Sequence, residues 1–234
     1  MRPIGFSTGA LALADVHCGL ALARQHSLRV VELSSLRDTE LTTVLNVLGE
    51  LDPAEFQFVS FHAPSAFLTI TEVKAADRIR VEAPPTSPII VHPDVLTVPE
   101  CWRALGPRLC IENMDKRKPT GRTATELAAI FDVYPEATLC FDIGHARQVD
   151  PTMGVAADIL RRFGDRLCQV HISEVNARNR HEPISYTAFR AFRTVAHLIP
   201  EGTPIVSEAV VDESAIGREL FVTAAALSPR NENG

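Results

Sequence analysis

Short apolar runs rich in β-branched residues recur along the whole chain, and most are followed by apolar positions at helical spacing. Their length is that of buried strands, and their alternation with helical patterns is typical of parallel α/β folds. The predicted strands are 4–7, 29–33, 56–61, 89–91, 109–111, 138–141, 167–170 and 205–207. Eight strand–helix units predict a (β/α)₈ TIM barrel, slightly smaller than the usual barrel of about 250 residues.

The helical segments between these strands differ in how clearly they are signalled. Thr123 and Glu126 have the spacing of a capping box and begin a helix that reaches about residue 133. Pro84-Pro85 excludes a helix at the end of the segment after the third strand, which leaves a short helix over 73–79 or a loop. We therefore expect shortened crossovers after strands three and four. Thr8-Gly9 is predicted to form a turn that leads into a helix up to about residue 25. Further helices are predicted over 39–50, 99–105, 153–163, 186–198 and from 212 onward.

Polar residues end the predicted strands from the second to the eighth. In a doubly wound open sheet these ends would lie along a line, whereas in a closed barrel they surround one mouth. A barrel is therefore favoured over an open sheet. We expect one barrel domain over residues 1–227 and a flexible tail over 228–234. No apolar run reaches the length of about 20 residues that a membrane span requires.

The net charge indicates which partners to expect, and the cysteines indicate the cellular compartment. The chain has 29 acidic and 23 basic residues, a net charge of −6, which argues against a nucleic-acid partner because such surfaces are usually basic. Five cysteines lack disulfide or metal-site spacing and indicate a reducing compartment, so we expect a cytoplasmic protein. The sequence leaves open whether the chain forms a homo-oligomer.

Imidazoles and carboxylates dominate the predicted strand ends. Together they are the usual ligands of zinc, manganese, cobalt and iron, whereas carboxylates alone favour magnesium. Barrel enzymes place their chemistry at the carboxyl ends of the strands, so a divalent-metal centre is expected there. A basic cluster over 116–118 is interpreted as a solvated loop, with contact to a substrate phosphate or carboxylate as the alternative. The strand-end residues are Glu32, His62, His92, Glu112, Asp142, His145, His171 and Glu208.

Six short motifs occur at these strand ends in a fixed order. They are His62-Ala63-Pro64, Val91-His92-Pro93, Ile111-Glu112-Asn113, Asp142-Ile143-Gly144-His145, Val170-His171-Ile172 and Ser207-Glu208. In this order they resemble the xylose isomerase-like TIM-barrel superfamily, which includes sugar epimerases and endonuclease IV. The resemblance covers residues 4–208 and implies a metal-dependent barrel enzyme without selecting one reaction.

One branch of that superfamily, the ketose 3-epimerases, implies a single metal ion and two carboxylates that exchange a proton with the substrate. The residues that match its metal ligands are Glu112, Asp142, His171 and Glu208, of which Glu112 and Glu208 would be catalytic. His62 and His145 would orient substrate oxygens, and Glu174 would steady the following loop. The substrate-gripping arginine of this branch is replaced by Ala177, with Arg178 one position later.

Endonuclease IV, the other branch, carries three zinc ions. Its ligands match His62, His92, Glu112, Asp142, His145, His171, His181 and Glu208. The remaining ligand, an aspartate, is Asn179 here, and a neutral amide is a poor ligand for a hard dication. This branch implies hydrolysis of a phosphodiester, with a second metal held by His62, His92 and Glu112.

Three functions follow as hypotheses. The first is an isomerase or epimerase of carbohydrate metabolism that acts on a sugar or sugar phosphate with zinc, manganese or cobalt. The second is a phosphodiesterase of the endonuclease IV type. The third is a metal- or sugar-binding barrel that has lost catalysis, because its crossovers are short. Glu32 is a further candidate for metal or substrate binding under each of them.

Overall fold

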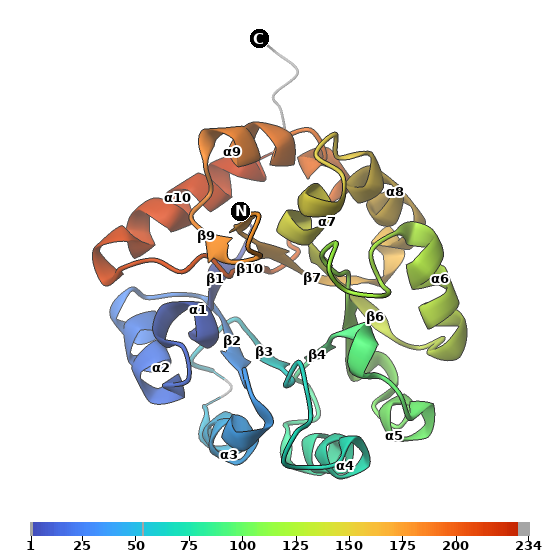
Figure 1. Ribbon diagram of the computed structural model, residues 1–234. Helices are drawn as coiled ribbons and strands as arrows, with labels where there is room; N and C mark the ends of the chain where they lie inside the picture. Colours follow the sequence, from blue (N-terminus) through green and yellow to red (C-terminus); the bar gives the residue numbers. More distant parts are fainter. Residues whose placement is uncertain (1, 53, 229–234) are drawn as a thin grey trace.

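Eight parallel strands close into a barrel in the computed structural model, which describes residues 2–52 and 54–228 (Figure 1). The order around the barrel is β1-β10-β7-β6-β5-β4-β3-β2, with every pair parallel. The predicted TIM barrel is confirmed. The strands are β1 (Ile4–Ser7), β2 (Val30–Ser34), β3 (Phe58–His62), β4 (Ile89–Val91), β5 (Leu109–Glu112), β6 (Thr138–Asp142), β7 (Leu167–Ile172) and β10 (Ile205–Ser207).

Helices surround the barrel, and a short antiparallel ribbon lies beside its mouth (Figure 1). The ribbon pairs β8 (Glu174–Val175) with β9 (His181–Glu182). Of the predicted tail over 228–234, residues 229–234 lie outside the described part of the chain. The helices are α1 (Thr8–Ala12), α2 (Val16–Gln25), α3 (Leu41–Glu50), α4 (Glu72–Glu82), α5 (Pro99–Arg103), α6 (Ala124–Val133), α7 (Ile143–Val149), α8 (Gly154–Phe163), α9 (Tyr186–Phe192) and α10 (Ile216–Ala226).

Two predicted segments differ from the structure because of their caps. The helix expected after a turn at Thr8-Gly9 begins at Thr8 itself, because Ser7 caps it. It is divided into α1 and α2, since Leu13 has a φ of 53° and Asp15 accepts a hydrogen bond from the backbone of Cys18 at 2.9 Å. The segment after β3 forms α4, eleven residues long, because Thr71 caps its start and the helix ends before Pro84. Shortening is therefore confined to the crossover after β4, where α5 has five residues.

The strands are apolar on both faces because each face is covered. Alternate residues point outward to the helices and belong to the main core, among them Phe6, Phe61 and Phe141. The inward-facing positions form a separate small cluster of Ile90, Cys110 and Cys140, against which Cys168 packs. Three cysteines thus fill space inside the barrel.

No helix in the described part of the chain combines the length and the apolar composition needed to cross a membrane.

Candidate metal centre and pocket

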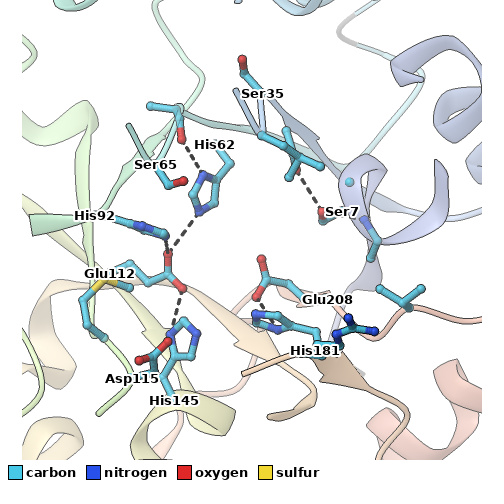
Figure 2. Close-up of a pocket in the computed structure, with 18 of the residues that line it drawn as sticks. Ser7, Ser35, His62, Ser65, His92, Glu112, Asp115, His145, His181 and Glu208 are labelled. Carbon is cyan, nitrogen blue, oxygen red and sulfur yellow. Dashed lines mark hydrogen bonds and ion pairs between the residues drawn. The ribbon is translucent and has the colours of Figure 1, made fainter. Parts of the chain in front are cut away.

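Glu112, at the end of β5, lies among four imidazoles. Its Oε2 atom is 3.1 Å from Nε2 of His62 and 3.2 Å from Nε2 of His92 (Figure 2). Its Oε1 atom is 3.3 Å from Nδ1 of His171 and 3.4 Å from Nδ1 of His145. The side chain of Glu112 is 1% exposed. One buried carboxylate therefore joins two sets of ligand-type side chains.

The first set is the one that the epimerase-like motifs indicated. Glu112, Asp142, His171 and Glu208 each offer one ligand atom, and these atoms all lie within 4.8 Å of one another. The Oδ2 atom of Asp142 and the Oε2 atom of Glu208 are buried and accept no hydrogen bond, although Nδ1 of His145 lies 3.4 Å from the first and Nδ1 of His181 lies 3.3 Å from the second. A buried carboxylate oxygen without a hydrogen bond is costly, and a cation would offset that cost. The donor set and these two oxygens fit a divalent ion of the zinc, manganese or cobalt type.

The second set consists of His62, His92 and Glu112, whose ligand atoms also lie within 4.8 Å of one another. The two imidazole rings meet edge to face, with centroids 5.0 Å apart. Nδ1 of His62 donates to the carbonyl oxygen of Ala63 at 2.8 Å, which leaves Nε2 directed at the carboxylate of Glu112. These three residues can therefore hold an ion next to the first one.

His145 and His181 form a pair on the other side of the centre. Their ring centroids are 5.4 Å apart. His181 lies 2.8 Å from the hydroxyl of Ser173 and 3.3 Å from Oε2 of Glu208, measured from Nδ1. Among the described residues, neither ring belongs to a group of three ligand atoms within 4.8 Å of one another. Asn179 hydrogen-bonds to Gln148, so it supplies no third ligand here.

Asp142 owes its orientation to the start of α7, a helix that the sequence did not indicate. Its Oδ1 atom accepts a hydrogen bond from the backbone of His145 at 2.6 Å and so caps the helix. The side-chain amide of Asn113 bonds both the N–H and the carbonyl of Asp142, each at 2.8 Å. The carbonyl of Asn113 accepts from Nδ1 of His145 at 3.0 Å. These bonds leave Oδ2 of Asp142 for the metal centre.

Glu32 lies beneath the centre and does not line the pocket. Its Oε2 atom accepts hydrogen bonds from Nε2 of His171 at 2.9 Å, Nε2 of Gln169 at 2.7 Å and the hydroxyl of Ser60 at 3.1 Å. The other ring nitrogen of His171 thereby faces Glu112 and Glu208. A carboxylate behind a histidine is common at metal sites, because it fixes the ring and its tautomer.

Burial and close charges shift the pKa values of the centre. Burial disfavours the charged form of Glu112, but the facing His171, His62 and His92 outweigh it and hold its pKa well below the usual range. Burial also works against charge on His62, yet its hydrogen bond to Glu112 and the charge of Glu32 raise its pKa to about 9. Burial raises the pKa of Asp142 to about 7, although His145 opposes the shift. The metal-free centre thus retains protons that a cation would displace.

Above the centre is a cavity of about 870 Å³. Six of the residues proposed from the sequence line it, namely His62, His92, Glu112, His145, His181 and Glu208. Asp142 and His171 lie deeper and are fully buried. The cavity thus opens directly onto the carboxylates of Glu112 and Glu208 (Figure 2).

Two further sequence candidates lie away from the cavity. Glu174 is 3.2 Å from Nη1 of Arg147 and accepts from the backbone of Ser185 at 3.1 Å, so it holds the segment after β7 in place. Arg178 is exposed in the loop between β8 and β9, and the pocket is lined instead by Arg180, two residues later. The ribbon carries Arg180 there, and it lies directly before His181 in the sequence.

The basic cluster after β5 is divided between pocket and solvent. Arg117 and Lys118 line the pocket, as does Asp115, which the sequence did not indicate. Nη2 of Arg117 lies 2.8 Å from Asp115, and Nζ of Lys118 lies 2.7 Å from Asp94. Both cations are therefore already paired with carboxylates.

Comparisons with known proteins give a fold but no sequence relative. No protein-family model matches the chain, and no curated protein matches it. Endonuclease IV from Thermus thermophilus is 17% identical, with a TM-score of 0.61 over 96% of this chain and 98% of that one. A zinc-bound structure of the IolI protein is 15% identical, with a TM-score of 0.67 over 97% and 98% of the two chains. The 3-keto-D-glucoside 4-epimerase YcjR from E. coli is 12% identical, with a TM-score of 0.63 over 97% and 99%.

These structures share the TIM-barrel fold of this chain over nearly its whole length. They comprise a nuclease, a zinc-binding protein and a sugar epimerase, so the shared fold does not select an activity.

Proposed function

We propose that the chain is a divalent-metal-dependent isomerase or epimerase that acts on a sugar or sugar phosphate. The observation that carries this proposal is the convergence of Glu112, Asp142, His171 and Glu208 at the base of a small-molecule-sized cavity. A divalent cation held by these four residues would supply Lewis-acid polarisation of a substrate carbonyl.

The two glutamates are the proposed proton carriers. Glu208 is 15% exposed in its side chain and lines the cavity, so its carboxylate can reach a bound substrate and take a proton from the carbon next to the carbonyl. Glu112 faces the same cavity from β5 and is placed to return the proton from another side (Figure 2). His62 and His145, which also line the cavity, are proposed to orient substrate oxygens.

A direct test is exchange of the substrate α-proton with solvent. Protein purified without chelator is incubated in D₂O with a panel of ketoses, aldoses and their phosphates, and deuterium incorporation is followed by NMR. We expect incorporation with the native chain and its loss in Glu208→Gln. The matched control is Glu182→Gln, because Glu182 lines the pocket but belongs to neither ligand set. Undiminished exchange in Glu208→Gln would refute the assignment of Glu208.

The His62–His92–Glu112 set favours a second candidate, a two-metal phosphodiesterase. Adjacent ions in such enzymes stabilise the attacking and leaving oxygens of a phosphate ester. The net charge of −6 does not support a DNA-binding groove, so this candidate ranks second. Two bound metals per chain together with nicking of abasic-site DNA would favour it, and one metal without nicking would exclude it. Metal binding without either activity would indicate a binding barrel.

We also propose a cytoplasmic location, which is supported by the five unpaired cysteines, of which Cys110 and Cys140 are buried.

A further inference from the structure

One wall of the cavity carries three exposed apolar side chains. It is formed where β1 and β2 end and by the segment after β10, and its apolar members are Leu13, Leu36 and Val210. Their exposed fractions are 63%, 43% and 51%, which makes them three of the eight large hydrophobic residues exposed in the described part of the chain. We call these three residues the apolar wall. Such a group at the mouth of a cavity is typical of a binding surface.

The hydroxyl groups beside the apolar wall are engaged within the chain. The hydroxyls of Ser7 and Ser34 hydrogen-bond to each other at 2.9 Å, and that of Ser7 also accepts from the backbone of Ala10 at 3.3 Å. Ser35 donates to the carbonyl of Arg37 at 2.9 Å. Since these polar groups have partners, this side of the cavity offers a ligand mainly carbon surface.

Leu13 is held in a backbone conformation that favours glycine. Its φ is 53° and its ψ is −122°, at the junction of α1 and α2. For a residue with a Cβ atom such a conformation is strained, and here the side chain gains little burial in return. Strain of this kind is concentrated at functional sites. A strained and exposed leucine that lines a cavity therefore indicates a contact with a ligand.

Leu36, the second member of the apolar wall, packs against the start of α1. It lies against Gly9, where a Cβ atom would come within 3.0 Å of its Cδ2 atom. Leu36 and Leu13 therefore flank the same short helix, α1, which ends one residue before Leu13. Across the cavity, Arg117 and Lys118 are already paired with carboxylates, so they do not dictate a phosphate-bearing ligand.

We propose that the apolar wall binds an alkyl or aryl group of the substrate. The substrate would then be a sugar derivative with an apolar substituent, its carbonyl end at Glu112 and Glu208 and its substituent on Leu13, Leu36 and Val210. This inference rests on the proposed function. A cavity of about 870 Å³ lies within the range that holds drug-sized ligands, so it has room for both parts.

The test compares two hydroxamates that differ only in the alkyl tail. A hydroxamate presents two oxygens in one plane, as an α-hydroxy carbonyl group does, and binds divalent metals. Acetohydroxamate and hexanohydroxamate are titrated into the metal-loaded chain by calorimetry. Each fully buried methylene strengthens binding about fourfold, so we expect a gain of about tenfold or more from the four added methylenes, even if only some reach the wall.

Leu13→Gly removes the side chain and suits the local backbone, so the fold should be retained. We expect this variant to lose most of the tail-dependent gain and to bind acetohydroxamate as the native chain does. Phe221→Ser is the control, because Phe221 is 74% exposed on α10 and does not line the pocket. Equal affinities for the two hydroxamates, or a gain that persists in Leu13→Gly, would overturn the proposal.

The α-proton exchange assay separates this proposal from the proposed function. A tail-dependent gain without exchange on any sugar would support the apolar wall and refute the isomerase. Exchange without a tail-dependent gain would refute the apolar wall and leave the isomerase standing. Absence of both would refute both.

Discussion

Two arcs of the same barrel mouth have opposite chemistry. From β3 to β7 the strand ends carry ligand-type side chains, and we call this part of the mouth the ligand arc. Its residues are His62, His92, Glu112, Asp142 and His171. At β1 and β2 the ends carry serines that bond within the chain and leucines that face the cavity. The backbone geometry is common to both arcs, so the difference lies in the terminal residue of each strand. The ligand-type residues and the proposed apolar wall therefore lie mainly on different arcs of one rim, with Glu208 after β10 between them.

The largest expected effect would come from removing the charge at the middle of the ligand arc. In Glu112→Gln a neutral amide replaces the carboxylate that both ligand sets share. We expect metal affinity to fall more than about 100-fold, beyond the usual effect of a residue behind the ligands. Metal content by mass spectrometry and metal titration would measure the loss. Glu182→Gln should bind metal normally, and full metal content in Glu112→Gln would contradict the shared role.

The second prediction concerns Glu32, which lies on the arc at β1 and β2 but contacts the metal centre from beneath. Glu32 belongs to β2 and bonds the rear nitrogen of His171. Glu32→Gln should lower metal affinity by about 10–100-fold while leaving the ligands themselves intact. Glu219→Gln is a matched control, since Glu219 is a buried glutamate that bonds the backbone of Ile184 on the outside of the barrel. Equal affinities in the two variants would show that Glu32 plays no orienting role.

The stability of the metal-free chain should depend on pH through the ligand arc, because the groups with shifted pKa values discussed here lie on it. His62 has a pKa of about 9 against an ordinary value of 6.5, so its stabilising effect is complete below pH 6.5 and is lost as the pH rises through 9. Asp142, raised from 3.8 to about 7, also favours the folded state less as the pH rises through that range. The depressed pKa of Glu112 contributes a constant stabilisation above pH 5.

We therefore expect the melting temperature of the metal-free chain to fall between pH 6.5 and 9.5. Metal affinity should rise by about tenfold between pH 7 and 8, because the ion displaces a proton from His62. Calorimetric melting of chelator-treated protein, repeated with metal, would measure both trends. A melting temperature that rises over this range would contradict the assigned charge states.

The smallest effect concerns the apolar wall. Leu13→Gly should raise the free energy of unfolding by up to about 1 kcal/mol, because relief of the backbone strain exceeds the unfolded-state entropy that glycine adds, and the lost side chain is mostly exposed. The melting temperature would rise by about 2–4 °C in a chain of this size. Leu68→Gly should not stabilise, since Leu68 is 87% exposed and is not among the residues with positive φ. Equal shifts in both variants would argue against strain at Leu13.

The ligand arc could be predicted from the sequence because strand ends are a local signal. Apolar runs that stop at an imidazole or carboxylate mark the mouth of a barrel, and closure brings His62, Glu112 and Asp142 together without further information. Glu32 shows the limit of this reasoning. The predicted strand ended at residue 33, whereas β2 continues to Ser34 and carries Glu32 one layer deeper. A difference of one or two residues in where a strand ends determines whether a side chain lies at the mouth of the barrel or in its interior.

The features that could not be predicted depend on contacts between distant segments or on backbone conformation. The sequence shows Asn113 only as an amide after a strand. Its role in fixing the backbone of Asp142 depends on two hydrogen bonds that join β5 to β6. The ribbon of β8 and β9 is only two residues long in each strand, too short for a periodic signal, yet it brings Arg180 to the cavity. Leu13 lies within a run whose apolar spacing favours a continuous helix, and its positive φ has no sequence signature.

The carboxylate of Asp142 has one oxygen that caps α7 and a second that faces the proposed ion site. A substitution that removes the ligand would therefore also remove a helix cap. Evolutionary drift from a metal-binding barrel to a metal-free one is correspondingly constrained at this position, because folding alone would still select for a short side chain with a hydrogen-bond acceptor. Asparagine or serine would satisfy the helix but not the cation, so either residue at this position in a homologue would identify a lineage that kept the fold and abandoned the metal.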